Sequence, residues 1–199
     1  MARQTREIIE NCVYHTFSRL HNKEDLMKPK EIKHLMELVL EMALEKYKFH
    51  LNNYALLDNH FHFMMTTLAG EANISTIMQF IKSQFAQRYN KMMNRSGSVW
   101  NERFGDTIIE NSEYPLFYFL WLCIYIFYNP VRKNYVSDPR NYEFSCMGFY
   151  LDEHHKPRLN LTHSKYFINL GKTFKERVAE ILKFEDMYLK KIFDERIFA

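Results

Sequence analysis

The chain has 199 residues, of which 47% are hydrophobic and 16% aromatic. This composition excludes a disordered chain and predicts one domain, or one domain with an extension. The net charge of +3 permits an acidic partner without requiring one. The three cysteines are too widely spaced for a CxxC metal site or a disulfide framework, and we expect buried thiols in a reducing cytoplasm. The charged start predicts no signal peptide, and the longest apolar run, 116–128, is too short to span a membrane.

The first third of the chain predicts a strand, a helix and a pair of strands. The alternating, β-rich stretch Val13 to Ser18 predicts a strand. Apolar residues at helical spacing predict a helix over Pro29 to Tyr47, opened by its proline. Two strands follow at Phe49 to Leu57 and Asn59 to Thr67, joined by a tight turn at Asp58-Asn59.

The rest of the chain predicts three further helices and one short strand. An amphipathic helix is expected at 74–93, a strand at 107–110, a third helix at 115–128 and a final helix at 172–198. We expect Ser112 to cap the third helix and Pro130 to end it. The final helix contains 7 basic and 6 acidic residues, which predicts a solvated amphipathic helix docked on the body. Exchange of this helix between subunits, or DNA binding by it, is left open.

The order β-α-β-β-α-β, followed by a helix and a tail, predicts a ferredoxin-like α+β sandwich. In this fold one antiparallel sheet has its helices on one face. The third helix and the C-terminal helical extension are additions to it. We place the main domain at 1–145 and the extension at 146–199.

Two histidines, His60 and His62, lie two residues apart in the predicted strand 59–67. Alternation along a strand points both imidazoles to one face, while Phe61 and Phe63 point to the other and suit packing beneath helices. The histidine face is then expected on the side of the sheet away from the helices. The imidazoles are close enough to share a metal ion, although two half-exposed histidines bonded to neighbours are the more ordinary explanation.

A tyrosine and an asparagine, Tyr125 and Asn129, lie one turn apart on one face of the third helix. Tyr125 could act as a nucleophile and Asn129 as an oxygen ligand to a metal. The chain has 13 tyrosines, and in so aromatic a helix packing is the ordinary role of a tyrosine.

A stripe of basic residues runs along the helix predicted at 74–93 and into the segment after it. From Lys82 to Arg103 the chain has five basic residues and one acidic residue, Glu102, with Tyr89 and Trp100 among them. Guanidinium groups and aromatic rings suit single-stranded nucleic acid. An ordinary solvated helix face would also be basic and polar, but the near absence of acid favours nucleic acid.

These motifs together resemble a family over about two thirds of the chain, from Val13 to Ser145. The segments VYHTFSR (13–19), YALLDNHFHFMM (54–65), SQFAQRYNK (83–91), GSVWNERF (97–104) and YIFYNPVRKNYV (125–136) resemble, in the same order, motifs of the REP-associated tyrosine transposases. These are relatives of the single-strand insertion-sequence transposases among the HUH endonucleases. The chain departs from the family pattern at Asp58, where proline is usual, at Leu20-His21, where a glycine-containing pair is usual, and at Phe127, where histidine is common.

The resemblance implies a role for each matched residue. Tyr125 matches the nucleophile, His60 and His62 match the metal-binding pair, and Asn129 matches the third metal ligand. The residues expected to contact nucleic acid are Arg19, Lys82, Arg88, Lys91, Arg95, Trp100, Arg103, Arg132 and Lys133. The implied cofactor is Mg²⁺ or Mn²⁺, which would polarise the phosphate oxygens.

The resemblance implies cleavage and rejoining of single-stranded DNA, at hairpin or palindromic ends, through a 5′-phosphotyrosine. The implied protein acts in the cytoplasm, without a membrane partner, as a monomer or a homodimer. Two other functions stay open: a hairpin-DNA-binding protein in which Tyr125 is idle, and a metal hydrolase unrelated to DNA. Cleavage by the wild type and by Tyr125→Phe separates the first two, and the third predicts no affinity for oligonucleotides.

Overall fold

The computed structural model describes residues 8–197, with side chains to residue 191. Residues 1–7, part of the stretch in which we expect no signal peptide, and Phe198, the last residue predicted for the final helix, lie outside the described residues. None of the helices within 8–197 is long and apolar enough to cross a membrane.

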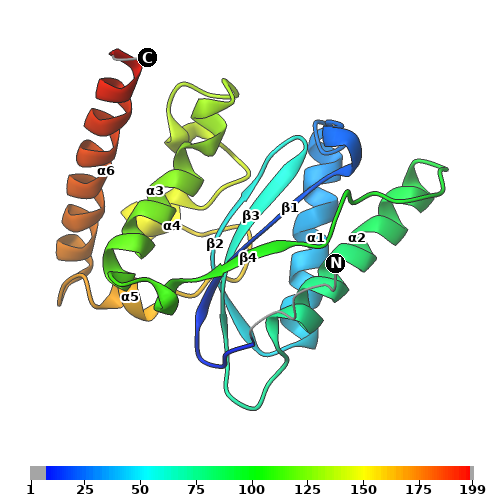
Figure 1. The fold of residues 1–199 in the computed structure, drawn as a ribbon, viewed down its shortest axis with the longest axis horizontal. Helices are drawn as coiled ribbons and strands as arrows, with labels where there is room; N and C mark the ends of the chain where they lie inside the picture. Colours follow the sequence, from blue (N-terminus) through cyan, green and yellow to red (C-terminus); the bar gives the residue numbers. More distant parts are fainter. Residues whose placement is uncertain (1–7, 198–199) are drawn as a thin grey trace.

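Four strands and two helices in the order β-α-β-β-α-β form the predicted ferredoxin-like core (Figure 1). The strands are β1 Val13–Arg19, β2 Phe49–Leu56, β3 His60–Thr67 and β4 Gly105–Ile108. The helices are α1 Lys30–Lys46, α2 Ile74–Met92, α3 Pro115–Arg132, α4 Met147–Leu151, α5 Lys165–Ile168 and α6 Phe174–Ile197, with 3-10 turns at His21–Lys23, Ile109–Asn111 and Pro139–Asn141. The sheet order is β2-β3-β1-β4 and every pair is antiparallel, which confirms the predicted fold class.

The last strand lies earlier in the chain than predicted. We expected it at 107–110, but β4 ends at Ile108 and a 3-10 turn follows. The carboxylate of Glu110 accepts a hydrogen bond from the backbone N–H of Val13 at 3.0 Å. The side chain of Glu110 therefore binds the first residue of β1, and the main chain leaves the edge of the sheet at this point.

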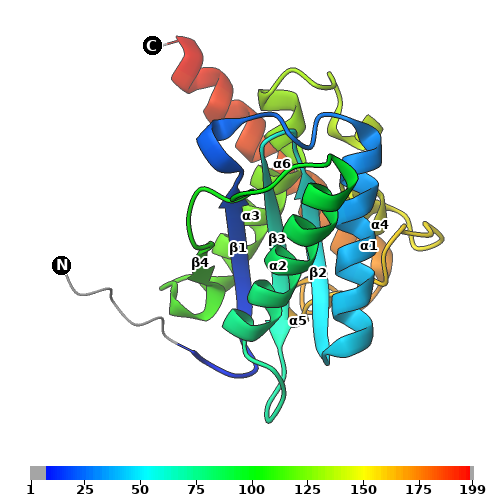
Figure 2. The same ribbon diagram turned by 90° about the vertical axis from the view of Figure 1, so that its right-hand side faces the viewer.

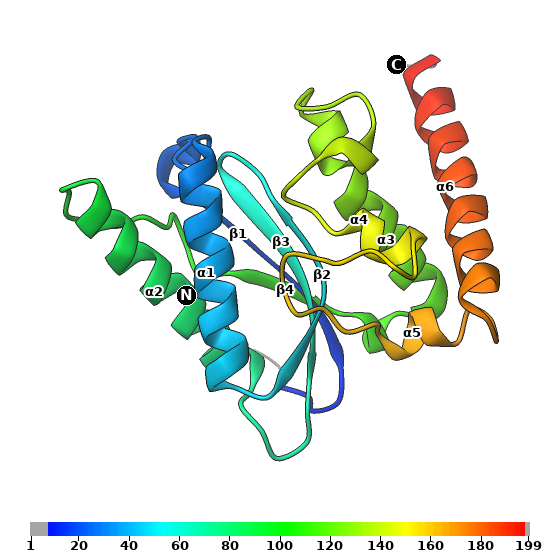
Figure 3. The same cartoon turned by 180° about the vertical axis from the view of Figure 1, so that it is seen from behind.

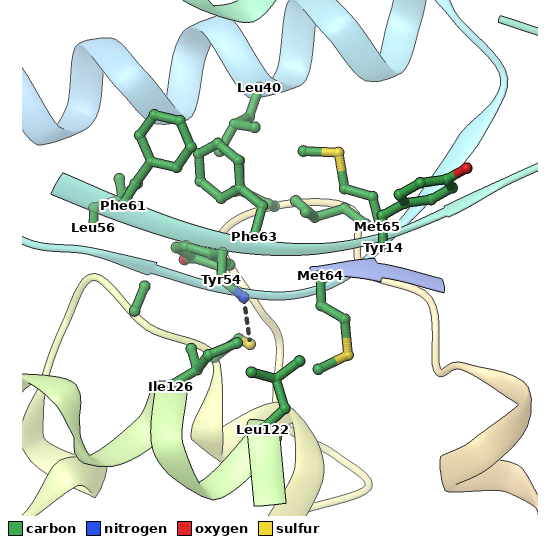
Figure 4. Close-up of a cluster of buried hydrophobic side chains, with 14 of the residues drawn as sticks. Tyr14, Leu40, Tyr54, Leu56, Phe61, Phe63, Met64, Met65, Leu122 and Ile126 are labelled. Carbon is green, nitrogen blue, oxygen red and sulfur yellow. Dashed lines mark hydrogen bonds between the residues drawn. The ribbon is translucent and has the colours of Figure 1, made fainter. Parts of the chain in front are cut away.

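One face of the sheet packs against α1 and α2 (Figures 1 and 2). Phe61, Phe63 and Met65 of β3 point toward these helices and are fully buried, and the rings of Phe61 and Phe63 stack at 4.1 Å. Figure 4 shows them on the same side as Leu40 of α1. The alternation predicted from the sequence therefore determines which side chains of β3 enter the core beneath α1 and α2.

The opposite face of the sheet carries His60 and His62, away from α1 and α2 as we expected, and α3 covers it in part. Met64 of β3 points to Leu122 and Ile126 of α3 (Figure 4). This helix is apolar on almost every side, and a helix of that kind must be covered on more than one side. The sheet covers one side of α3 and α6 covers another (Figure 3).

Two sequence signals for the ends of α3 are wrong. Pro130 lies inside the helix, which continues to Arg132. A proline in the last turn removes only one helical hydrogen bond, and the helix ends instead where Asn134 takes a left-handed conformation with φ of 58°. Ser112 accepts a hydrogen bond from Tyr114 N–H at 3.2 Å, but the N-cap position belongs to Tyr114.

The C-terminal segment packs against β2 and α3. The Tyr150 hydroxyl donates to the Asn52 carbonyl at 2.7 Å, and Tyr128 of α3 donates to Glu185 of α6 at 2.6 Å. The docking predicted for the final helix is thus confirmed. Cys12, Cys123 and Cys146 are free and buried, as expected.

Candidate active site

Neighbouring strands bring three histidines together on the α3 side of the sheet. His60 and His62 lie on β3, and the antiparallel register places Arg19 opposite His60 and Phe17 opposite His62. His15, two residues before Phe17, therefore shares their face, and its Nε2 lies 2.9 Å from His62 Nδ1. All three imidazoles are buried, with exposed fractions of 5 to 7%. They are therefore not the half-exposed strand histidines of the ordinary explanation.

The turn before β3 fixes which nitrogen of His60 carries its proton. Asn59 Nδ2 donates to the carboxylate of Asp25 at 2.8 Å, so its Oδ1 is the amide atom that faces His60 Nδ1, also at 2.8 Å. An amide oxygen only accepts, so His60 Nδ1 must be protonated and Nε2 must have a free lone pair. Asp58, the residue that replaces the usual proline, holds the turn to α1 through an ion pair of 2.6 Å with Lys33.

A second hydrogen-bonded series fixes the tautomer of His62. The Asn129 amide nitrogen lies 3.1 Å from His62 Nε2, which accepts its hydrogen bond. Nδ1 of His62 must then be protonated and donate to His15 Nε2. Both strand histidines therefore carry an unprotonated Nε2, and their ring centroids lie 5.2 Å apart.

The helix α3 supplies both predicted functional side chains. The ring of Tyr125 lies edge-on to His62, with a centroid distance of 5.5 Å, and stacks on Trp121 at 5.2 Å. Asn129 is one turn further and is buried. The structure thus brings together Tyr125, His60, His62 and Asn129, the four residues that the sequence singled out for catalysis and metal binding.

Two imidazoles and one amide are a suitable donor set for a divalent ion. Two adjacent ligands of an octahedral ion with bonds of about 2.1 Å lie about 3.0 Å apart. The 3.1 Å separation of Asn129 and His62 is close to that spacing, once the amide turns its oxygen inward. Among the described residues no group of three or more His, Cys, Asp or Glu side chains could hold a metal ion, so a site here depends on the amide.

Burial keeps the imidazoles neutral. It lowers the pKa of His15 to about 4, and burial together with the charges of Arg19 and Lys133 lowers the pKa of His60 to about 4. The pKa of His62 lies well below its usual range, because of burial first and then the neighbouring histidines and arginines. Neutral imidazole is the form that binds metals.

A cavity of about 700 Å³ opens onto these residues, and its lining includes His60, His62, Tyr125, Phe17 and Arg103. Arg19 lines it as well, and Arg132 stands over the Tyr125 ring at 5.2 Å. Arg19, Arg103, Arg132 and Lys133 are all exposed. Four of the predicted DNA contacts therefore surround the site with positive charge.

Two other predicted DNA contacts lie inside the protein, and each is only 9% exposed. The Lys82 ammonium donates to Ser18 Oγ at 2.7 Å and to the Glu102 carbonyl at 2.6 Å. The Trp100 indole donates to the Lys82 carbonyl at 2.8 Å and its ring packs at 5.3 Å from Phe85. Their polar groups are already bonded within the protein, so the structure does not support the surface roles that we expected.

The remaining basic residues, on α2 and in the turn after it, lie on the other side of the sheet from the histidines. Arg88 bonds to Gln84, Arg95 stands over the Tyr89 ring at 5.6 Å, and Lys91 is exposed. The structure does not bring them to the cavity. A second hollow, of about 540 Å³, runs along α2 and shares Glu102, Arg103 and Phe104 with the cavity, so the two hollows lie next to each other.

Sequence reasoning missed three residues of the site: His15, Asn59 and Phe17. The alternation of β1 already placed His15, Phe17 and Arg19 on one face. The missing step was the pairing of β1 with β3, which follows from the strand order of the ferredoxin-like fold. The role of Asn59 depends on the conformation of a turn, which its sequence does not specify.

We predict that the metal-free protein loses stability on mild acidification. The folded-state pKa values of His15 and His60 are lowered to about 4, so between pH 6.5 and 4 the unfolded chain binds more protons than the folded one. The free energy of unfolding is then unaffected by these groups above pH 6.5 and falls below it, by up to about 1.4 kcal/mol per pH unit for each histidine. Urea unfolding in EDTA at pH 7.0 and 5.0 measures this, and His15→Gln should show a smaller pH dependence. Equal slopes for the two proteins would contradict the prediction.

A family model, a curated protein and solved structures are similar to this chain. The family model described as "Transposase IS200 like" matches residues 8–115, more than half of the chain. A protein of Haemophilus influenzae named "Putative REP-associated tyrosine transposase" is 24% identical over 114 residues, which are 53% of this chain and 62% of that protein. The chain thus spans less than two thirds of that relative's length.

A solved structure of a REP-associated tyrosine transposase bound to a REP hairpin has the same fold. It superposes with a TM-score of 0.64 at 18% identity and covers 83% of this chain and 96% of the solved one. With the family match over residues 8–115, the conclusion is direct: this chain belongs to the IS200-like transposase family.

Proposed function

We propose that this protein is a DNA strand transferase that cleaves and rejoins single-stranded DNA through a covalent bond to Tyr125. The observation that carries the proposal is the position of Tyr125, whose ring lies against His62 at the mouth of a cavity with an exposed cationic rim. The solved relative was bound to a REP hairpin, and we extend that substrate class, a hairpin, to this chain.

In the proposed reaction the Tyr125 hydroxyl oxygen attacks the scissile phosphorus. A bond forms between this oxygen and phosphorus, the bond from phosphorus to the 3′ oxygen breaks, and that oxygen leaves with a proton as a 3′-OH. The phenolic proton passes to solvent. The product is a 5′-phosphotyrosine, and attack by a 3′-OH reverses the step, so strands can be rejoined without another energy source.

The chain's own residues would hold the phosphate and the ion. The Nε2 atoms of His60 and His62 and the amide oxygen of Asn129 would hold Mg²⁺ or Mn²⁺, which when bound polarises the phosphate oxygens. Arg132, whose guanidinium stands 5.2 Å from the centroid of the Tyr125 ring, places positive charge over the ring of the attacking residue. Arg19 and Arg103 line the same cavity and would bind the flanking phosphates.

We predict that Tyr125→Phe abolishes the covalent product and leaves DNA binding intact. The protein is incubated with Mn²⁺ and a labelled pool of hairpins taken from palindromic repeats, and the products are separated on a denaturing gel. The wild type should form an adduct on the 5′ end of the downstream fragment, and the variant should form none, because only the attacking oxygen is lost.

Tyr118→Phe is the matched control, since Tyr118 lies on the same helix two turns earlier. An adduct that persists in Tyr125→Phe would identify another nucleophile. A gel shift on the same hairpins without an adduct in either protein would favour a DNA-binding protein that does not cleave.

We predict that His60→Ala and His62→Ala each lose the adduct and bind Mn²⁺ at least about tenfold more weakly. Hairpin affinity should change less than about threefold, because each variant removes a neutral side chain that is buried behind the cationic rim. Calorimetric titration with Mn²⁺, without DNA, reads the metal site independently of cleavage. The control is His154→Ala, at an exposed position. Unchanged Mn²⁺ affinity in both variants would remove the strand histidines from the metal site.

We predict that Arg88→Ala combined with Lys91→Ala weakens hairpin binding and reduces its dependence on salt. Each lost phosphate contact should lower the slope of log K against log[salt] by about 0.7 to 0.9. The matched control is Lys183→Ala with Lys190→Ala on α6, two side chains that are 70% and 72% exposed and give the same change in charge. An equal slope in the α2 variant and the wild type would confine the DNA to the cavity side of the sheet.

A further inference from the structure

One aromatic side chain in the active-site cavity is exposed and has no part in the proposed chemistry. Phe17 of β1 is 41% exposed, although the histidines beside it are buried. Its ring centroid lies 5.3 Å from that of His15 and 6.1 Å from that of His62. Exposed phenylalanine is costly in water, and this ring lies at the cavity wall beside the proposed metal ligands.

The neighbouring strand β4 makes room for this ring. Gly105 pairs with Phe17 across the two strands, and a Cβ atom at Gly105 would lie 2.4 Å from Phe17 Cζ and 2.6 Å from Cε2. Gly105 has no positive φ that would itself require glycine. Because position 105 has no side chain, the Phe17 ring can occupy this space, and any larger residue at 105 would displace the ring.

The surroundings of Phe17 suit a nucleotide better than a protein or a lipid. Arg19 follows it on the same face of β1, and Asn101, Arg103 and Tyr125 line the same cavity. Arginines bind phosphates, the amide can hydrogen bond a base edge, and an exposed ring is a surface on which an unpaired base stacks. Trp100, the aromatic residue expected for this purpose, is buried.

We propose that Phe17 is the stacking platform for one unpaired nucleobase at or next to the scissile phosphate. The proposal rests on the proposed function, since the base belongs to the strand that Tyr125 would attack. Its position, 6.1 Å from the ring of His62, limits the stacked base to the scissile nucleotide or an immediate neighbour. Phe17 would thus orient the strand rather than take part in the bond exchange.

A structural role for Phe17 is the competing explanation. An aromatic ring laid over a glycine in the neighbouring strand protects that strand and stabilises the sheet. In that case replacement of Phe17 would lower the free energy of unfolding and reduce affinity equally for every DNA. A stacking platform instead predicts an effect that depends on one position of the DNA.

The test combines Phe17 variants with abasic DNA in the Tyr125→Phe background, where binding is read without cleavage. A hairpin with a single-stranded flank is made as a series in which one nucleotide at a time lacks its base, and dissociation constants are measured for Phe17, Phe17→Leu and Phe17→Tyr proteins. Phe117→Leu is the control, because Phe117 is 54% exposed but lies at the start of α3. Urea unfolding of each variant reports on the structural role.

We expect Phe17→Leu to bind the intact hairpin about 5- to 20-fold more weakly. At one abasic position the two proteins should bind equally, Phe17→Tyr should behave as the parent, and Phe117→Leu should have no effect. The same loss at every abasic position, or no loss with Phe17→Leu, would overturn the platform. Failure of the proposed function is read separately, as the absence of an adduct when Tyr125 is present.

Discussion

The packing of α3 across the histidine face of the sheet is the contact on which the site depends. Leu122 and Ile126 of this helix meet Met64 of β3 (Figure 4), and the same helix then places Tyr125 and Asn129 against His62. Because apolar side chains and the proposed functional side chains share one helix, the packing that stabilises the fold also sets the distance between Tyr125 and the histidines. A shift of α3 by a fraction of a turn would separate them, so the geometry needs a rigid helix.

The two histidines proposed to bind the metal, His60 and His62, are oriented by residues that are not proposed metal ligands. Asn59 and His15 each accept a hydrogen bond from an Nδ1 atom, of His60 and His62 respectively, so the Nε2 atom of each strand histidine is unprotonated and has a lone pair. Metal-binding histidines are commonly oriented in this way by a second hydrogen bond. The buried position then has a consequence for charge, since the lowered pKa values of all three imidazoles keep those lone pairs available well below neutral pH.

Much of this arrangement was predictable from sequence, because the spacing of residues along a strand or a helix shows which side chains share a face. The alternation of HFHFMM separated the histidine face from the core, and the i, i+4 spacing placed Tyr125 and Asn129 together. Properties that depend on tertiary contacts were not predictable. Lys82 and Trp100 look like surface DNA contacts in a basic segment, but the chain from 100 to 104 folds over α2 and buries both. Proline cannot donate a backbone hydrogen bond, and this loss commonly ends a helix. Pro130 lies in the last turn of α3, where the helix continues to Arg132 without that bond.

The charges around the site indicate how an ion and a phosphate would act on each other. The proposed donors are two neutral imidazoles and an amide, and the charges that act on the imidazoles are mainly those of Arg19, Arg132 and Lys133, with Asp58 opposing them at His60. Positive neighbours repel a divalent cation, and neutral donors do not offset that repulsion. A phosphodiester in the cavity would supply negative charge that balances both the basic side chains and the proposed metal ion. We therefore expect the binding of DNA and the binding of the proposed ion to favour each other.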